Sequence, residues 1–228
     1  APPLLDLERM APRKLRVLAL CGGHSCAAVL RVQTTALRLA LGKDVSEWTF
    51  LEGSEDWTHS PGEPVISEME EKLAQGSQLK NWYMDSCEES GGVQTGRTNR
   101  EKQFDRTTRV FYQGIPAAVE RLRRQVMDAG PFDVLVAFSQ GTVMAHLLIG
   151  HLRREAPGVE DAKRWHCTRN GAEQMPWEIS VFFNGMHVRD EDYFHLFEQK
   201  SPHPTVHVFG REDEFYDYGR DGFGNQPQ

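Results

Sequence analysis

Residues 134–145 read Val-Leu-Val-Ala-Phe-Ser-Gln-Gly-Thr-Val-Met-Ala, and this stretch decides the fold. An apolar run ends at Ser139, and a helical pattern of apolar residues begins immediately after it. A serine between a buried strand and a helix N-terminus fits a nucleophile elbow, in which a sharp turn lifts the hydroxyl clear of the sheet. The first N–H groups of such a helix face any negative charge that develops beside the serine. Ala137 and Gly141 supply the small residues that a strained turn requires.

The segments around this stretch predict a doubly wound, mostly parallel α/β sheet in a three-layer α/β/α sandwich. Strands alternate with helices along the chain, and this order favours parallel strands joined by right-handed crossovers. The helix before the central strand has Ile115, Val119, Leu122 and Val126 on one face. The expected strands are 15–21, 46–51, 132–138, 178–184 and 205–209, and the expected helices are 25–41, 114–129, 140–154 and 191–199.

Three parts of the chain lie outside this pattern. Residues 1–13 are rich in proline and are expected to form an N-terminal arm, so that residues 14–228 make a single domain. Residues 52–110 are polar and glycine-rich, with one amphipathic piece at 65–73, and are expected to form an insertion. Either a lid over the sheet edge or a mobile surface excursion, most disordered at 91–101, is consistent with this composition. Residues 159–176 are expected to form a second, smaller insertion.

Composition narrows the possible functions. The 228 residues carry a formal net charge of −7, which disfavours nucleic acid or an anionic membrane as the main partner. No apolar run approaches the ~20 residues of a membrane span, and the N-terminus lacks the apolar core of a signal peptide. The four cysteines are scattered, so a reducing, cytoplasmic location is expected.

The strand ends gather the residues that an acyl-transfer site needs. In a parallel sheet the site forms outside the carboxyl ends of the strands, and this rule brings Ser139, Asp213 and the Gly22–Gly23 turn to one edge. The N–H groups of Gly23 and Gln140 are candidate donors to the oxyanion of a tetrahedral intermediate. An acid after a strand often caps a turn instead, and Glu212 and Asp217 are neighbours that could be confused with Asp213.

Several ordered motifs resemble those of the small serine hydrolase family of the α/β-hydrolase superfamily. This resemblance implies an intracellular ester or thioester hydrolase, with Ser139 as nucleophile and Asp213 as the acid of the triad. Cys21 and Gly23 depart from the histidine and the bulky residue that are usual in the first turn. The matching stretches are 18–23 (LALCGG), 30–41 (LRVQTTALRLAL), 82–83 (WY), 112–115 (YQGI), 130–133 (GPFD), 137–141 (AFSQG), 183–185 (FNG) and 207–213 (HVFGRED).

The family's catalytic histidine has no counterpart in this sequence. The resemblance places it a few dozen residues after Asp213, whereas the sequence stops 15 residues after Asp213, with no histidine in that tail. A truncated C-terminus is the expected reason, and the alternative is a catalytically inactive binding or scaffold protein with this fold. His24 and His187 lie at the correct edge to replace it, but surface histidines without a role are the simpler interpretation.

No metal site and no cofactor is expected. The stretch Cys21-Gly22-Gly23-His24-Ser25-Cys26 contains zinc-ligand types, but its spacing matches no common zinc site. It also lacks the third glycine of a dinucleotide-binding turn. Trp82 and Tyr83 either line an acyl pocket or fill the core beneath the insertion. The sequence therefore predicts a serine esterase or thioesterase that acts on a small-molecule substrate.

Overall fold

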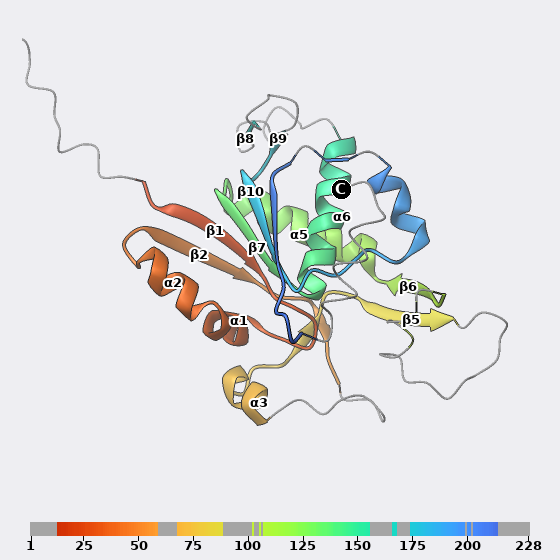
Figure 1. The fold of residues 1–228 in the computed structure, drawn as a ribbon, viewed down its shortest axis with the longest axis horizontal. Helices are drawn as coiled ribbons and strands as arrows, with labels where there is room; N and C mark the ends of the chain where they lie inside the picture. Colours follow the sequence, from red (N-terminus) through yellow and green to blue (C-terminus); the bar gives the residue numbers. More distant parts are fainter. Residues whose placement is uncertain are drawn as a thin grey trace, which may run out of the picture.

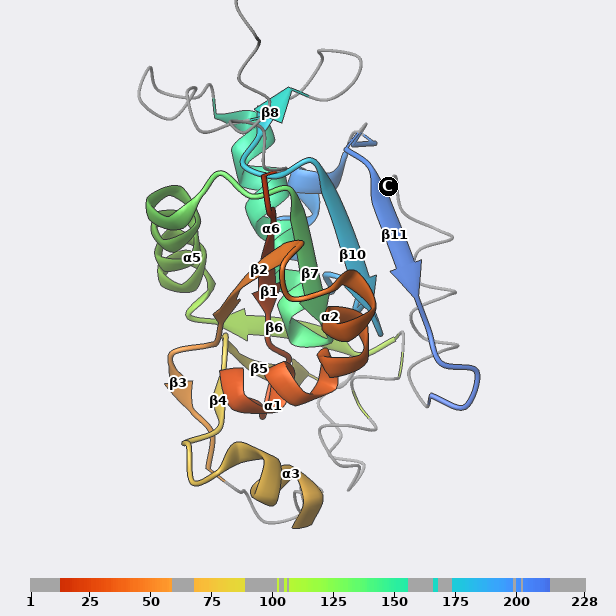
Figure 2. The ribbon, with the colours of Figure 1, turned by 90° about the vertical axis from the view of Figure 1, so that its left-hand side faces the viewer.

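The computed structural model describes residues 13–58, 68–88, 102, 105, 107–155, 166–167, 174–198, 200–201 and 203–213. Within these residues, five parallel strands form the central sheet in the order β11-β10-β7-β1-β2. The sheet winds outward in both directions from β1 and β7, so the carboxyl ends of these two strands lie side by side (Figures 1 and 2). The five strands are β1 (Leu15–Leu20), β2 (Ser46–Leu51), β7 (Val134–Phe138), β10 (Ile179–Phe183) and β11 (Thr205–Val208).

Helices cover both faces of the sheet, which confirms the predicted doubly wound α/β class. On one face lie α1 (Ala27–Gln33) and α2 (Thr35–Leu41). On the other lie α5 (Ile115–Ala129), α6 (Gln140–Arg154) and the 3-10 helix η2 (Glu191–Phe197) (Figures 1 and 2). Right-handed crossovers between parallel strands place helices on both sides in this way.

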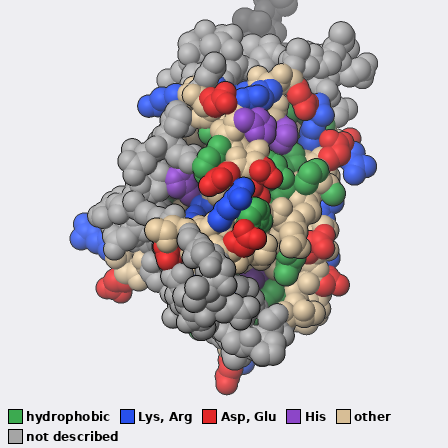
Figure 3. Space-filling model, turned by 90° about the vertical axis from the view of Figure 1, so that its right-hand side faces the viewer, with side chains coloured by type: hydrophobic (Ala, Val, Ile, Leu, Met, Phe, Trp, Pro, Cys, Tyr) green, Lys and Arg blue, Asp and Glu red, His purple; other side chains and the backbone are tan. Residues whose placement is uncertain are grey.

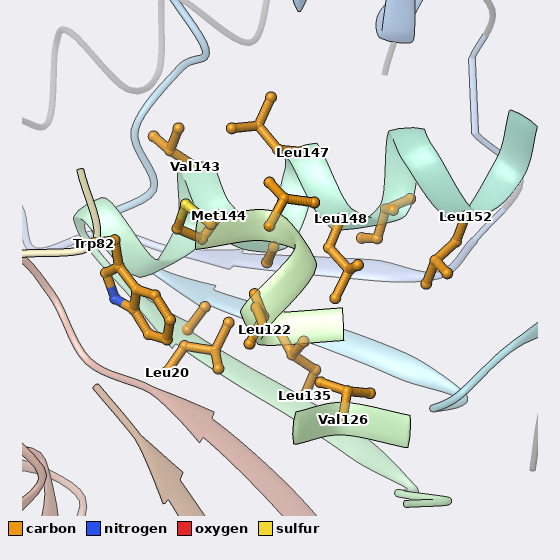
Figure 4. Packing of buried hydrophobic residues seen from close by; sticks show 14 of the residues in the cluster. Leu20, Trp82, Leu122, Val126, Leu135, Val143, Met144, Leu147, Leu148 and Leu152 are labelled. Carbon is orange, nitrogen blue, oxygen red and sulfur yellow. The ribbon is translucent and has the colours of Figure 1, made fainter. Parts of the chain in front are cut away.

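The main core fills the space between the sheet and the helices α5 and α6. The four apolar residues that the sequence places on one face of α5 are all buried, and Gly130 ends that helix as its C-cap. Leu122 and Val126 of α5 pack between Leu135 of β7 and the apolar side of α6 (Figure 4). Burial of each such side chain stabilises the fold by roughly 1.5–3 kcal/mol relative to exposure. This packing fixes α6, and with it the position of Ser139.

The single helix expected over residues 25–41 is two helices in the structure. Thr34 separates α1 from α2, with φ −87° and ψ 3°. Its hydroxyl donates to the Leu30 carbonyl at 2.8 Å, and a threonine that bonds back in this manner bends a helix. After the bend, α2 buries none of its residues, and Leu39 is 76% exposed.

The region expected to be an insertion contains short elements in its described part. The pairs β3 with β4 and β5 with β6 are antiparallel. The amphipathic piece expected at 65–73 forms a helix from residue 68, whereas 65–67 and the segment expected to be disordered, 91–101, lie outside the described residues. In the second expected insertion, β8 and β9 form a two-residue pair. The elements are β3 (Glu55–Asp56), α3 (Glu68–Ala74), β4 (Lys80–Asn81), β5 (Met84–Glu88), β6 (Arg109–Gln113), β8 (His166–Cys167) and β9 (Gln174–Met175).

Trp82 and Tyr83 connect β4 to β5 and are buried in the main core, at 1% and 2% exposed. Of the two interpretations that the sequence allows for this pair, filling the core is therefore the one observed. Trp82 packs beside Leu20 of β1 (Figure 4), and its indole N–H donates to the Cys21 carbonyl at 2.8 Å. The middle of the region 52–110 is thus fixed to the end of the first strand.

Asp133 joins the amino ends of β1 and β7. These ends lie at the edge of the sheet opposite to the carboxyl ends of the same strands. Its carboxylate accepts two hydrogen bonds from the Arg13 guanidinium, at 2.6 and 3.0 Å, and one from the Arg16 N–H at 2.7 Å. The Asp133 N–H donates back to the Arg16 carbonyl at 2.8 Å. Charge-assisted, bidentate pairs of this kind are among the stronger hydrogen bonds in proteins. The aspartate of the GPFD stretch therefore sets the register between β1 and β7.

A buried polar cluster also lies at this amino edge. The His203 Nε2 is 3.0 Å from the Ser180 hydroxyl and 3.0 Å from the Trp177 indole nitrogen. All three residues are buried, and burial lowers the pKa of His203 to about 4. The histidine is therefore neutral in the folded protein at neutral pH.

This cluster predicts a loss of stability in acid. The unfolded chain takes up the His203 proton near its ordinary pKa of about 6.5, whereas the folded chain does so only near 4. Stability is thus complete above pH 6.5 and falls as the pH drops toward 4, by about 3 kcal/mol in total. Urea unfolding of the wild type and of His203→Gln at pH 7.0 and 4.5 measures this contribution. An equal acid-induced loss in both proteins would contradict the assignment to His203.

Candidate active site

Ser139 lies at a sharp turn between β7 and α6. Its backbone has φ 48° and ψ −119°, a conformation that non-glycine residues rarely adopt. The Ser139 N–H donates to the Phe183 carbonyl of β10 at 3.1 Å, and its carbonyl accepts from the Thr142 N–H at 2.8 Å and the Thr142 hydroxyl at 2.6 Å. These hydrogen bonds hold the Ser139 backbone in its strained conformation, and such strain is common at functional sites.

Small residues allow this turn to approach the end of β1 closely. A Cβ atom on Gly141 would lie 2.4 Å from the Cys21 carbonyl oxygen, so only glycine fits there. A Cβ atom on Gly22 would lie 3.3 Å from the Cβ of Ser139. The serine and the glycine turn are therefore in direct contact.

The two candidate oxyanion donors lie beside the serine. Gln140 is the first residue of α6, so its N–H has no partner within the helix. Neither this N–H nor that of Gly23 donates to any acceptor within the residues that the structure describes. A Cβ atom on Gly23 would lie 3.1 Å from the Gln140 Oε1, which shows how near the two residues are.

Asp213 lies at the same edge of the sheet but two strands away. It follows β11 by five residues and is half-buried, and its N–H donates to the Gly210 carbonyl at 3.3 Å. β10 lies between β7 and β11, so the strands that lead to Ser139 and Asp213 are about 10 Å apart. The two side chains are not hydrogen-bonded to each other.

The Ser139 hydroxyl contacts Met186, which the rule for strand ends brings to the same edge of the sheet. Its Oγ donates to the Met186 Sδ at 3.5 Å, and the Met186 N–H donates to the Thr142 hydroxyl at 2.8 Å. Met186 belongs to the loop after β10, and the sequence places this loop at the edge without indicating that Met186 contacts the serine. Among the described residues, no histidine is hydrogen-bonded to Ser139.

The described histidines occupy other positions. His24 packs on Trp57, with ring centroids 5.1 Å apart, and the His187 carbonyl accepts from the Tyr112 hydroxyl at 3.3 Å. His146 of α6 packs on Phe182, and burial, with smaller effects of neighbouring histidines, lowers its pKa to about 3. The Ser–His contact between Ser180 and His203 is buried at the opposite edge of the sheet.

Other chemistries find less support in the described residues. Burial raises the pKa of the Cys21 thiol well above its ordinary value, with a further contribution from Glu52, so the thiol stays protonated and unreactive. No group of three or more metal-ligating side chains occurs in the described part of the chain. On the face shown in Figure 3, acidic and basic side chains are interspersed rather than separated by sign. None of the described helices is long and apolar enough to cross a membrane.

Comparisons with known proteins identify the family. The family model described as Serine hydrolase (FSH1) matches residues 10–221. Esterase FPY3 of Fusarium mangiferae is 23% identical over 210 residues, which cover 90% of this chain and 78% of the relative. Esterase C25G4.2 of Caenorhabditis elegans is 27% identical over 206 residues, covering 88% and 73%. Hydrolase phiM of a fungal species (strain ATCC 74256) is 29% identical over 114 residues, covering 46% and 48%. Because the family model matches nearly the whole chain, the protein belongs to the FSH1 serine hydrolase family of the α/β-hydrolase superfamily.

Proposed function

We propose that the protein hydrolyses a carboxylic ester or thioester of a small molecule through an acyl-serine intermediate. The observation that carries this proposal is the strained turn at Ser139, which is in contact with the Gly22–Gly23 turn. The N–H groups of Gly23 and Gln140, on either side of that contact, have no acceptor among the described residues. Membership of a serine hydrolase family and the likeness to two proteins named esterases support it.

The proposed roles follow from the position of each group. The Ser139 Oγ attacks the substrate carbonyl carbon while its proton passes to an imidazole. The oxyanion that forms accepts hydrogen bonds from the Gly23 and Gln140 N–H groups, each worth roughly 3–4 kcal/mol of barrier. When the intermediate collapses, the bond to the leaving oxygen or sulfur breaks, and the imidazole returns its proton to the leaving group. Water then hydrolyses the acyl-serine by the same route.

In this proposal Asp213 orients the imidazole and stabilises its charged form. The imidazole belongs to a residue outside the part of the chain that the structure describes, because no described histidine is hydrogen-bonded to Ser139. That same observation favours the second candidate function, a binding or scaffold protein that retains the fold without the activity.

We further propose a cytoplasmic location and a single hydrolase domain over residues 14–228, with residues 52–110 as its insertion. The described cysteines Cys21, Cys26 and Cys87 are free thiols, which suits a reducing compartment.

A fluorophosphonate probe tests the proposed function on the full-length gene product. The probe phosphonylates activated serines, so mass spectrometry of the digested protein is expected to find the adduct on Ser139. Hydrolysis of a short-chain p-nitrophenyl ester is expected to stop as the adduct forms. If a control hydrolase is labelled in the same assay and Ser139 is not, the enzyme proposal fails and the scaffold function is favoured.

A further inference from the structure

The Gly22–Gly23 turn has no side chains of its own to hold it in position. Within the described residues, the backbone groups of Gly22 and Gly23 make no hydrogen bonds. Glycine is also the residue with the greatest backbone freedom. An oxyanion donor has to be fixed within a fraction of an ångström before the reaction begins. The Gly23 N–H can therefore serve as a donor only if neighbouring residues fix the turn from outside.

Asn81 supplies this support. Its side-chain oxygen accepts from the His24 N–H at 2.8 Å, which fixes the peptide group that follows Gly23. The same oxygen lies 3.1 Å from the place that a Gly23 Cβ would occupy, so it also packs against the Gly23 backbone. The Asn81 side-chain nitrogen donates to the Met84 Sδ at 3.5 Å, a weak hydrogen bond because a thioether sulfur is a poor acceptor.

Asn81 is itself held rigidly on both sides. Lys80, immediately before it, exchanges backbone hydrogen bonds with Ser25 at 2.9 and 3.3 Å. A Cβ on Gly53 would lie only 1.9 Å from the Asn81 carbonyl oxygen, so the two backbones are in close contact. Asn81 is 3% exposed. Its amide is therefore a fixed acceptor and not a mobile surface group.

The side chain of Gln140 connects this support to the serine turn. Its Oε1 accepts from the Trp82 N–H at 2.8 Å, and its Nε2 donates to the Tyr83 carbonyl at 3.1 Å. Contacts thus run in a closed ring from Gly23 through His24, Asn81 and Trp82 to Gln140, and back to Gly23. The two oxyanion donors of the proposed function are both members of this ring.

We propose that Asn81 is a positioning residue that sets the separation and direction of the Gly23 and Gln140 N–H groups for the oxyanion. This inference rests on the proposed function of the same site. Asn81 touches neither substrate nor nucleophile. It acts by holding the turn that provides one donor at a fixed distance from the helix that provides the other.

The test compares Asn81→Leu with the wild type in full-length protein. Leucine has nearly the shape of asparagine but cannot accept the His24 N–H, so the turn loses its fixed orientation. We expect kcat for a short-chain p-nitrophenyl ester to fall by about 10- to 100-fold, while KM changes by less than about threefold. The inhibition constant of an alkyl trifluoromethyl ketone is expected to rise by the same factor as kcat/KM falls, because its serine adduct carries the oxyanion.

Met84→Leu is the matched control. It removes the partner of the Asn81 nitrogen and leaves the bond to the His24 N–H in place, so kcat is expected to stay within about threefold of the wild type. Asn81→Ala provides the same comparison if the leucine variant does not fold. A role limited to stability would lower the melting temperature without the parallel change in kcat/KM and ketone affinity.

The outcomes separate the inference from the function on which it rests. A folded Asn81 variant with kcat within threefold of the wild type would overturn the positioning role. So would a rate loss that ketone affinity does not follow. If the wild type is inactive, or its activity persists in Ser139→Ala, the proposed function fails and this inference fails with it.

Discussion

Replacement of Ser139 by alanine is expected to lower kcat for a p-nitrophenyl ester by about 10⁴- to 10⁶-fold, with the fold intact. Alanine removes the attacking oxygen, and what remains is the oxyanion site and substrate binding. Stability should change little, because the Ser139 hydroxyl contacts only the Met186 sulfur at 3.5 Å within the described residues. The measurement is steady-state kinetics on purified protein, accompanied by a thermal unfolding curve.

Ser180→Ala is the matched control for this variant. The Ser180 hydroxyl lies 3.0 Å from the ring nitrogen Nε2 of His203, so Ser180 is the competing nucleophile on geometry alone. It is fully buried at the amino edge of the sheet, where no substrate can reach it. We expect Ser180→Ala to retain its activity and to lose about 1 kcal/mol of stability through its hydrogen bonds. Loss of activity in Ser180→Ala, with activity retained in Ser139→Ala, would move the site to the opposite edge.

Asp213→Asn is expected to lower kcat by about 10⁴-fold at neutral pH. A carboxylate accepts the imidazole N–H and favours the positive charge that forms on the ring, whereas a carboxamide has no charge and can hold the ring in the wrong tautomer. KM should stay nearly unchanged, because Asp213 is not expected to contact the substrate. Kinetics across a pH series show whether the residual rate responds to added base.

Glu212→Gln distinguishes Asp213 from its acidic neighbour. Glu212 is exposed and Asp213 is half-buried, and both carry the same charge only one residue apart. A general electrostatic effect would make the two variants similar, whereas a triad role affects Asp213 alone. Equal losses in the two variants would refute the role assigned to Asp213.

The spacing of apolar residues predicts the strands and helices of the core, because burial of one face of each element requires that spacing. β2 begins and ends at the residues that the sequence predicts, and α6 ends at the predicted residue, Arg154. The four apolar residues of α5 are buried as expected. The glycines and prolines between the elements indicate most of the ends, because few other residues permit the required turns. These features depend on local pattern, so a single sequence is enough to find them.

The remaining features depend on contacts between distant residues. The break between α1 and α2 at Thr34 depends on the hydrogen bond from the Thr34 hydroxyl to the Leu30 carbonyl. The periodicity of apolar residues does not indicate this hydrogen bond. The importance of Asn81 arises from its distance to a turn 57 residues earlier in the chain. His203, in a polar segment, becomes a buried residue only because Ser180 and Trp177 surround it. The rule for strand ends, in contrast, predicts that Ser139, Gly23 and Gln140 lie close together. This rule describes the whole sheet and needs no knowledge of individual contacts.

The burial of Trp82 and Tyr83 limits how this protein can be engineered. Exchanging the stretch between β2 and α5 for that of a relative, in order to alter substrate choice, would also exchange two aromatic rings at the centre of the domain. A shorter replacement without those rings would leave voids that cost about 3–5 kcal/mol each. Chimeras should therefore keep residues 80–84 and vary only the segments on either side.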